Sequence, residues 1–345
     1  MRSRTLITHC ALRVTHYKAK AQSRSLSQRK LLYNLAKRKI DMNLENFKKA
    51  LESLGIGDTP LIPYEEDFDA DIYVKNEAMN ASGSVKDRAA LCMILDAEER
   101  GVLRQGDTLV EATSGNFGIS LAYVGLKRGY RVVLTMPDNM SAERRELLQG
   151  LGAQLVLTEG ALGMRGAIET VERLSSEKNH VWLRQFENSV NVQAHYLSTG
   201  TEIVEQLDRV DVFVAGVGTG GTLVGTARRI KECFPDCVIV AVEPASSAAI
   251  SRGESGSHAI QGIGAGFVPK LYDGAVVNRV ELVTDEQALD KFRELNLKQG
   301  YCCGVSSAAN IVVAERLAQQ AEFKGKNIVT LFPDGDDRYS SLLDN

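Results

Sequence analysis

The sequence has few of the features that mark membrane, metal-binding or nucleic-acid-binding proteins. None of its apolar runs reaches transmembrane length. A net charge of −3 over 345 residues gives no overall signal for a nucleic acid or membrane partner. The six cysteines contain no Cys-x-x-Cys pair, so a zinc site is not predicted, and reduced thiols in a cytoplasmic compartment are expected. The five histidines form no Ser/His/Asp or Cys/His arrangement that would indicate nucleophilic catalysis.

Acidic residues are almost absent from the first 41 residues. This leader carries eleven Lys/Arg and one acid, Asp41, whereas the rest of the chain has a net charge of −13. An acid-poor leader that contains Arg and Ser resembles an organelle transit peptide. A disordered arm, or a start codon upstream of the true one, explains it equally well, because Met42 opens a helical segment. Nucleic-acid binding is the least favoured interpretation, and we exclude the leader from the fold.

From residue 42 onward, short apolar segments alternate with amphipathic ones. This pattern is typical of buried parallel strands separated by helices, and it predicts an α/β protein with two domains. Strands are expected at residues 72–75, 108–111, 131–135, 154–157, 181–186, 211–215, 238–242, 280–283 and 328–332. Helices are expected at 89–100, 116–128, 163–175, 199–207, 222–233, 285–298 and 307–320, with one more after Ser141.

A glycine-rich loop, Gly216–Thr222, joins the strand at 211–215 to the following helix. Its glycines let backbone N–H groups converge without obstruction by Cβ atoms, and the helix start adds unpaired donors. Thr219 and Thr222 add hydroxyl groups. The loop is therefore a predicted phosphate site.

The same loop has a competing interpretation. Gly216-x-Gly218-x-x-Gly221 matches the dinucleotide fingerprint, and Glu243 ends the next strand at the expected spacing. On this segment alone, an NAD-dependent oxidoreductase is favoured. However, the loop lies late in the chain, and the second half supplies only part of the six-strand pattern. The oxidoreductase interpretation also leaves two upstream motifs unexplained.

The first of these motifs contains Lys86, at the end of the small-residue turn Ser82-Gly83-Ser84-Val85. A lysine near a helix start is usually solvated. Here Val85 and the apolar segment 89–91 predict a buried helix start instead. A desolvated lysine beside a phosphate-bearing cofactor is a good imine former and base.

The second motif, Thr113–Gly118, is a polar loop between a strand and a helix. It offers two hydroxyls, an amide and several backbone N–H groups, which suits a substrate carboxylate. An ordinary helix cap needs only one such residue. The lysine, the polar loop and the glycine loop together predict pyridoxal phosphate bound as a Schiff base.

The order and spacing of these motifs resemble the cysteine synthase (O-acetylserine sulfhydrylase) and cystathionine β-synthase family of fold-type II pyridoxal phosphate enzymes. The resemblance covers about residues 47–341. It rests on segments 57–61, 82–88, 113–116, 135–145, 163–167, 185–188, 218–222, 261–269, 304–307 and 333–334.

The resemblance implies two three-layer α/β/α domains with mostly parallel sheets (tryptophan synthase β-like) and the active site in the cleft between them. The smaller domain, 80–190, would carry Lys86 and the substrate loop. The larger domain, 42–79 plus 191–345, would carry the glycine loop.

It also implies residue roles. Lys86 would hold the cofactor and then remove the substrate Cα proton. The pyridoxal phosphate would further contact Asn116, Gly218, Thr219, Gly220, Gly221, Thr222 and Ser306. The substrate would contact Thr113, Ser114, Gly115, Asn116, Gln185 and Gly264.

The implied reaction is a β-replacement in which O-acetyl-L-serine and sulfide give L-cysteine and acetate through an aminoacrylate intermediate, with ping-pong kinetics. Ser306 offers the pyridine nitrogen a hydroxyl rather than a carboxylate, which weakens the electron sink and favours elimination. The family further implies a homodimer and a serine acetyltransferase as a partner.

The sequence departs from the family pattern at Phe117, where a small polar residue is common, and at Ala308, which replaces a glycine. Both leave the donor and the nucleophile open, so formation of cystathionine or lanthionine from serine and cysteine stays an alternative. O-phosphoserine is another, although Gly264–Gly266 offers no arginine for a substrate phosphate. Two further classes of function remain as alternatives to β-replacement: an NAD-dependent oxidoreductase and a non-catalytic scaffold.

Overall fold

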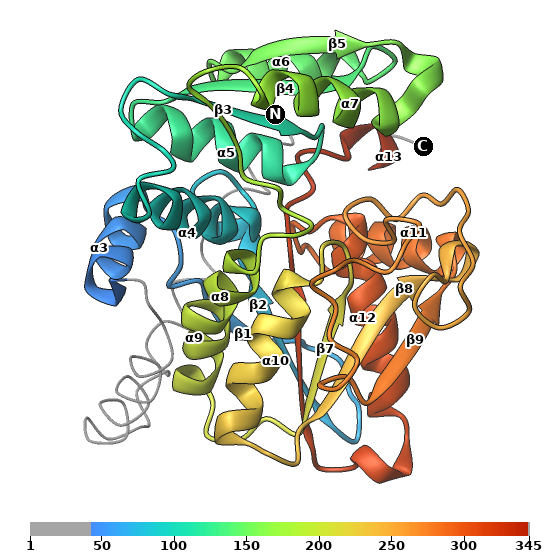
Figure 1. Cartoon of the computed structure of the whole chain (residues 1–345). Helices are drawn as coiled ribbons and strands as arrows, with labels where there is room; N and C mark the ends of the chain where they lie inside the picture. Colours follow the sequence, from blue (N-terminus) through green and yellow to red (C-terminus); the bar gives the residue numbers. More distant parts are fainter. Residues whose placement is uncertain (1–42, 344–345) are drawn as a thin grey trace. The chain divides into compact units, whose positions relative to one another are not determined.

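The computed structural model describes residues 43–343, so the basic leader lies outside the described residues. The described chain forms two compact units (Figure 1). The larger unit contains residues 57–85 and 192–343, and the smaller contains 43–56 and 86–191. The predicted α/β class with mostly parallel sheets is confirmed.

The larger unit is built on a six-stranded sheet with the order β1-β2-β10-β7-β8-β9. β1 is antiparallel to β2, and the other pairings are parallel. The central strands are buried along most of their length, which explains why they are apolar at consecutive positions. The strands are β1 (Leu61–Pro63), β2 (Asp71–Asn76), β7 (Val212–Gly216), β8 (Val238–Pro244), β9 (Arg279–Val283) and β10 (Asn327–Phe332).

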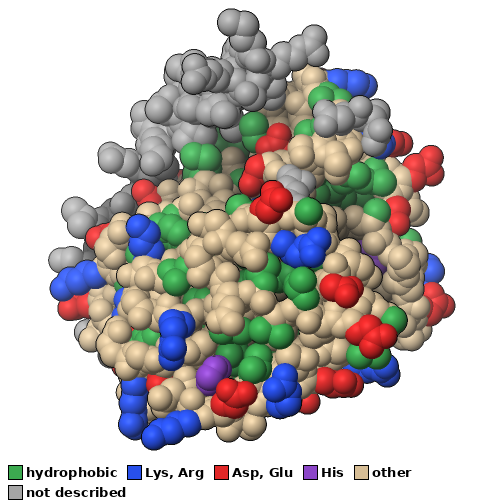
Figure 2. Space-filling model, turned by 90° about the horizontal axis from the view of Figure 1, so that it is seen from above, with side chains coloured by type: hydrophobic (Ala, Val, Ile, Leu, Met, Phe, Trp, Pro, Cys, Tyr) green, Lys and Arg blue, Asp and Glu red, His purple; other side chains and the backbone are tan. Residues whose placement is uncertain are grey.

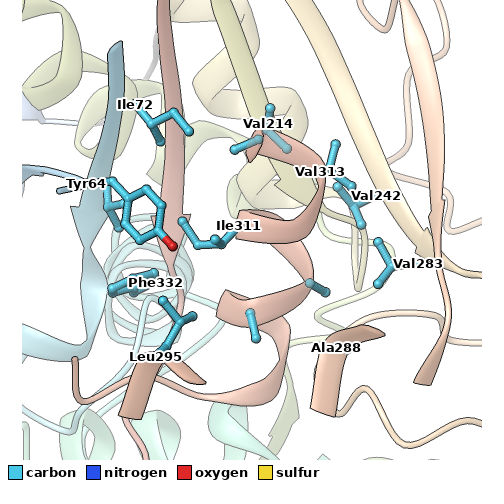
Figure 3. Close-up of a cluster of buried hydrophobic side chains, with 14 of the residues drawn as sticks. Tyr64, Ile72, Val214, Val242, Val283, Ala288, Leu295, Ile311, Val313 and Phe332 are labelled. Atoms are coloured by element: carbon cyan, nitrogen blue, oxygen red, sulfur yellow. The ribbon is translucent and has the colours of Figure 1, made fainter. Parts of the chain in front are cut away.

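Side chains alternate between the two faces of this sheet along each strand, so apolar strands present an apolar surface on both faces. Helices cover both of these surfaces. On one face, Ile72, Val214 and Val242 pack against Ile311 and Val313 of helix α12 (Val305–Ala318), as Figure 3 shows. Helix α11 (Asp285–Arg293) lies on this side too, through Ala288 and Phe292. On the other face, Phe213 and Ile239 pack with residues of α9 (Thr199–Gln206) and α10 (Gly221–Cys233). The larger unit therefore has three layers.

The smaller unit has a four-stranded parallel sheet with the order β5-β4-β3-β6. Val110, Ala112 and Val133 of this sheet pack against Ala167 and Val171 of helix α7, and α5 covers the opposite face (Figure 1). The elements are β3 (Thr108–Ala112), β4 (Arg131–Pro137), β5 (Gln154–Thr158), β6 (His180–Trp182), α4 (Lys86–Glu99), α5 (Asn116–Lys127), α6 (Ala142–Gly150) and α7 (Gly163–Ser175). Helix α8 (Val190–Leu197) begins at the end of this unit and belongs mostly to the larger one.

Helix α3 (Leu44–Leu54) groups with the smaller unit, although the sequence assigned residues 42–79 to the larger domain. It buries an apolar stripe that includes Phe47 and Leu51. The Tyr123 hydroxyl of α5 also donates to the Leu54 carbonyl at 3.0 Å. Packing onto the neighbouring helices thus decides the boundary.

Two elements differ from their expected bounds for local reasons. The strand expected at 181–186 ends at Trp182, because Arg184 has φ +57°, in the left-handed region that no strand residue occupies. The helix expected at 285–298 is α-helical to Arg293 and continues as a π-helix, Glu294–Lys298. β1 and α8 were not anticipated.

Within residues 43–343, we find no helix with both the length and the apolarity needed to span a bilayer. Figure 2 shows Lys/Arg and Asp/Glu side chains interspersed over the face in view. This face therefore carries no broad area of a single charge of the kind that attracts nucleic acid.

Candidate functional site

Lys86 is the first residue of α4 and is half-buried. The residues around it, Ser84, Val85, Asp87 and Arg88, are buried, which agrees with the helix start expected from the sequence.

The turn before Lys86 is held by the segment that follows β10. Val85 donates its N–H to the Pro333 carbonyl at 2.8 Å, Ser84 forms an isolated bridge with Asp334, and the Arg338 guanidinium donates to the Ser82 carbonyl. Pro333-Asp334 is one of the segments that carry the family resemblance, but the sequence predicts no role for it. The signal was its position directly after a buried strand, where functional loops of parallel sheets begin.

The predicted substrate loop, Thr113–Gly118, lies in the smaller unit at the end of β3. Thr113 is buried, and its Oγ1 accepts from the Gly115 N–H at 3.2 Å. Gly115 is the N-cap of α5 without a side-chain cap, and Asn116 is the first helical residue. Arg144 donates to the Ser114 carbonyl at 3.1 Å. The loop therefore presents the N–H groups of a helix start, as an anion site requires.

Gln185 lies at the same edge of this sheet. Val110 of β3 pairs in parallel with Trp182 of β6, and Thr113 and Gln185 follow these partners at equal spacing. Both residues are therefore at the carboxyl ends of adjacent strands. Gln185 is buried, and its carbonyl accepts from Asn191 Nδ2 at 2.9 Å.

Phe117, which departs from the family pattern, is only 2% exposed. It lies on α5 within the buried part of the smaller unit rather than at its surface.

The glycine loop of the larger unit joins β7 to α10. Gly220 has φ +88° and is the N-cap of α10 without a side-chain cap. A Cβ on Gly218 would lie 2.4 Å from the Gly262 carbonyl oxygen, so only glycine fits there. Thr219 is buried, and its Oγ1 accepts from the Gly221 N–H at 3.3 Å. The predicted loop thus packs its backbone directly against a second glycine segment.

The second glycine segment, residues 262–266, contains Gly264 and lies next to Ser306 of α12. Gly264 donates its N–H to the Val217 carbonyl at 2.9 Å, and its carbonyl lies 2.8 Å from His258 Nε2. Ser306, the second residue of α12, is 3% exposed, and its Oγ would be 3.9 Å from a Cβ on Gly262. The larger unit therefore gathers every site residue predicted from its part of the sequence.

His195, one of the histidines for which the sequence predicts no catalytic role, is fully buried behind this loop. Its Nε2 lies 3.2 Å from Thr222 Oγ1, and its Nδ1 lies 3.0 Å from Thr199 Oγ1. The imidazole thereby fixes the orientation of the Thr222 hydroxyl. Its sequence position, one turn before Thr199 in a helical stretch, was too weak a signal to reveal this.

Glu243, the acid of the dinucleotide alternative, is 2% exposed. Its two carboxylate oxygens accept from the N–H groups of Ile250 and Ser251, each at 2.9 Å. The carboxylate thus anchors a loop, and the hydroxyls of a ribose would have to displace both bonds.

These residues fit a phosphate-bearing ring cofactor. A glycine-rich loop at the start of a thirteen-residue helix suits a phosphate, and the adjoining Ser306 suits a ring nitrogen that is hydrogen-bonded but not paired with a charge. Among the described residues, no cluster of three His, Cys, Asp or Glu side chains could hold a metal ion.

Comparison with known proteins agrees with this fit. Residues 52–334 match the family described as pyridoxal-phosphate dependent enzymes. The chain belongs to this family. Its cofactor is pyridoxal phosphate, and membership in the pyridoxal-phosphate dependent enzymes decides against the NAD-dependent interpretation.

The chain is similar to Escherichia coli cysteine synthase A, with 48% identity over 300 residues that cover 84% of this chain and 93% of the relative. The structure is similar to cysteine synthase from Entamoeba histolytica, with a TM-score of 0.80 and 36% identity, covering 89% of this chain and 96% of the other. It is also similar to O-ureido-L-serine synthase, with a TM-score of 0.82 and 38% identity, covering 86% and 95%.

Proposed function

We propose that the protein is a cysteine synthase that converts O-acetyl-L-serine and sulfide into L-cysteine and acetate. The observation that carries this proposal is the 48% identity with Escherichia coli cysteine synthase A across most of both chains. The positions of Lys86, the Thr113 loop and the glycine loop support it, because each lies at a helix start or strand end.

Pyridoxal phosphate, when bound, supplies the electron sink that makes the Cα proton of the substrate acidic. Lys86 Nζ holds the cofactor, removes the Cα proton and later returns a proton to Cα. The Cβ–O bond to acetate breaks, and a Cβ–S bond to sulfide forms. Gly218–Thr222 would hold the phosphate, and the Ser306 hydroxyl would offer the ring nitrogen a hydrogen bond. Thr113, Ser114 and Gln185 bind the substrate carboxylate, while Asn116 contacts the cofactor ring.

The test is cysteine formation by the purified protein and two matched variants. Lys86→Ala should lose the visible absorption of the covalently held cofactor and reduce the rate by about 10³-fold or more. Lys127→Ala makes the same change at an exposed position of α5 and should leave both unchanged. Retention of cysteine formation by Lys86→Ala would refute the assigned role.

The nucleophile needs its own experiment, because the structural relatives include an enzyme named for a different product, O-ureido-L-serine. Rates with sulfide, cysteine and homocysteine, each with O-acetylserine, serine and O-phosphoserine, separate cysteine synthesis from cystathionine or lanthionine formation. A protein that holds the cofactor but turns over none of these pairs is a scaffold.

The proposal extends to assembly and location. The relationship to cysteine synthases supports a homodimer, a serine acetyltransferase as partner and a cytoplasmic location. Light scattering of the purified protein, alone and with a serine acetyltransferase, tests the first two. Imaging of the full chain tests the third, and it also decides whether residues 1–41 act as a transit peptide.

A further inference from the structure

A buried carboxylate lies where the two proposed carboxylate-binding segments leave the smaller sheet. Glu111 is the penultimate residue of β3 and is 2% exposed. Its Oε1 accepts from Trp182 Nε1 at 2.7 Å and from the Ala112 N–H at 3.3 Å. Trp182 ends β6, so one side chain links the ends of two adjacent strands.

The backbone after β6 turns toward this carboxylate at a conformational cost. Arg184 has φ +57°, which a residue with a side chain rarely adopts, and which persists where the surroundings compensate. Burial raises the pKa of Glu111 to about 7, and the hydrogen bond from the Trp182 indole opposes this rise most strongly. The amides of Arg184 and Gln185 also lower this pKa, but Glu111 Oε2 is buried without a hydrogen-bond partner among residues 43–343.

Among residues 43–343, the elements that pack on β3 place no buried cation beside Glu111. Arg184 is exposed, with its guanidinium carbon 4.0 Å above the centre of the Trp182 ring and its Nη1 3.7 Å from Glu187 Oε2. The ionisable side chains of these packed elements are half-buried or exposed, namely His180 of β6, Arg131 of β4, Tyr123 and Lys127 of α5, and Arg165, Glu169, Glu172 and Arg173 of α7. Polar hydrogens alone hold the carboxylate.

We propose that Glu111 is a positioning residue, which holds the Thr113 and Gln185 segments at the separation that the carboxylate of the amino-acid substrate requires. The inference rests on the proposed function, because it takes Thr113 and Gln185 as ligands of that carboxylate. It assigns Glu111 to substrate binding and not to proton transfer.

Steady-state kinetics of the holoenzyme test this assignment. Glu111→Leu removes every acceptor and should raise KM for O-acetylserine by up to about a hundredfold with a much smaller change in kcat. Glu111→Gln keeps the shape and one acceptor oxygen, so it should restore KM to near the wild-type value. A change in kcat alone would overturn the proposal, as would equal effects of Leu and Gln.

The only tryptophan of the chain provides a readout that needs no substrate. Trp182 emission in the holoenzyme should titrate with a midpoint near pH 7, because its indole donates to Glu111. Glu111→Gln should abolish this titration, and Glu169→Gln, the same change at an exposed position of α7, should preserve it. The same midpoint in Glu111→Gln would refute the link between the strands.

The two readouts separate this inference from the proposed function. A titrating Trp182 in a protein without cysteine synthase activity would refute the function and leave the link intact. An active enzyme whose emission does not titrate near pH 7, or whose KM responds equally to Glu111→Leu and Glu111→Gln, would refute the inference alone. If Glu111→Leu fails to fold, the Gln variant and the emission still decide.

Discussion

At the scale of residues, two buried ionisable side chains differ in whether an opposite charge lies beside them. Lys75 of β2 is fully buried, and its ammonium donates to the Thr59 carbonyl at 2.6 Å and to Gln206 Oε1 at 2.9 Å, with Glu202 Oε2 at 2.7 Å. All three of its hydrogens have acceptors, so Lys75 serves the structure and has none left for chemistry. The Glu111 carboxylate, in contrast, accepts hydrogen bonds from Trp182 and Ala112 and forms no ion pair with any of residues 43–343.

This contrast predicts a pH-dependent stability. The folded-state pKa of Glu111 is raised to about 7, so its effect on stability is favourable at low pH and is lost as the pH rises through 7. Glu111→Gln should therefore be more stable than the wild type at pH 8, by up to about 3 kcal/mol, with the difference vanishing near pH 4. Urea unfolding at both pH values measures this, and an equal difference at both would contradict it.

The buried contacts of Lys75 with Thr59, Gln206 and Glu202 predict a large loss of stability when Lys75 is replaced, although Lys75 lies outside the motifs. Lys75→Met leaves Glu202 and the Thr59 carbonyl without their buried partner and should reduce the free energy of unfolding by about 3–5 kcal/mol. Lys49→Met, at an exposed position of α3, should change it by less than about 0.5 kcal/mol. Loss of the cofactor absorption in Lys75→Met that had folded normally would show that the lysine assignment is wrong.

At the scale of elements, the start of α10 depends on two close backbone approaches. The Cβ of an alanine at position 218 would come within 2.4 Å of the Gly262 carbonyl oxygen, and one at 220 within 2.9 Å of the Tyr272 nitrogen. A backbone carbonyl cannot move aside as the tip of a side chain can. The loop and the segment around residue 262 are therefore fixed against each other.

Gly218→Ala should separate these two segments. We expect a loss of about 1–3 kcal/mol in stability and at least a tenfold weaker affinity for pyridoxal phosphate. Cofactor titration by absorbance and urea unfolding measure the two effects. Gly150→Ala is the matched control, since its Cβ would meet no atom within 4 Å at the end of α6. Undiminished cofactor affinity in Gly218→Ala would count against the phosphate assignment.

Elements differed in how far the sequence predicted them. Helix α7 has the expected bounds of 163–175, because its apolar period and flanking glycine act locally. β6 ends before its expected bound, because Arg184 adopts φ +57°, which no pattern in the neighbouring residues indicates. α3 joined the smaller unit through contacts with α4 and α5 that no local pattern specifies.

At the scale of the whole molecule, the cofactor should contribute to stability by mass action. A ligand that binds the folded chain alone stabilises it by about 2.7 kcal/mol at a concentration about 100 times its Kd. Removal of pyridoxal phosphate should therefore lower the melting temperature, and its return should restore it. NAD at the same concentration should have no effect, and a shift with NAD would revive the oxidoreductase interpretation.

The sequence by itself determined the alternation of strands and helices, the glycine loop, the lysine turn and the polar loop, because each depends on residues close together in the chain. It also determined the family, through the order of those motifs. The tertiary structure decided what surrounds them. Glu111 meets Trp182 because β3 and β6 pair, His195 meets Thr222 because α8 packs on α10, and Asp334 meets the lysine turn through an isolated bridge with Ser84. Burial and hydrogen-bond partners, which control ionisation and orientation, arise from that packing and have no signature in a single segment.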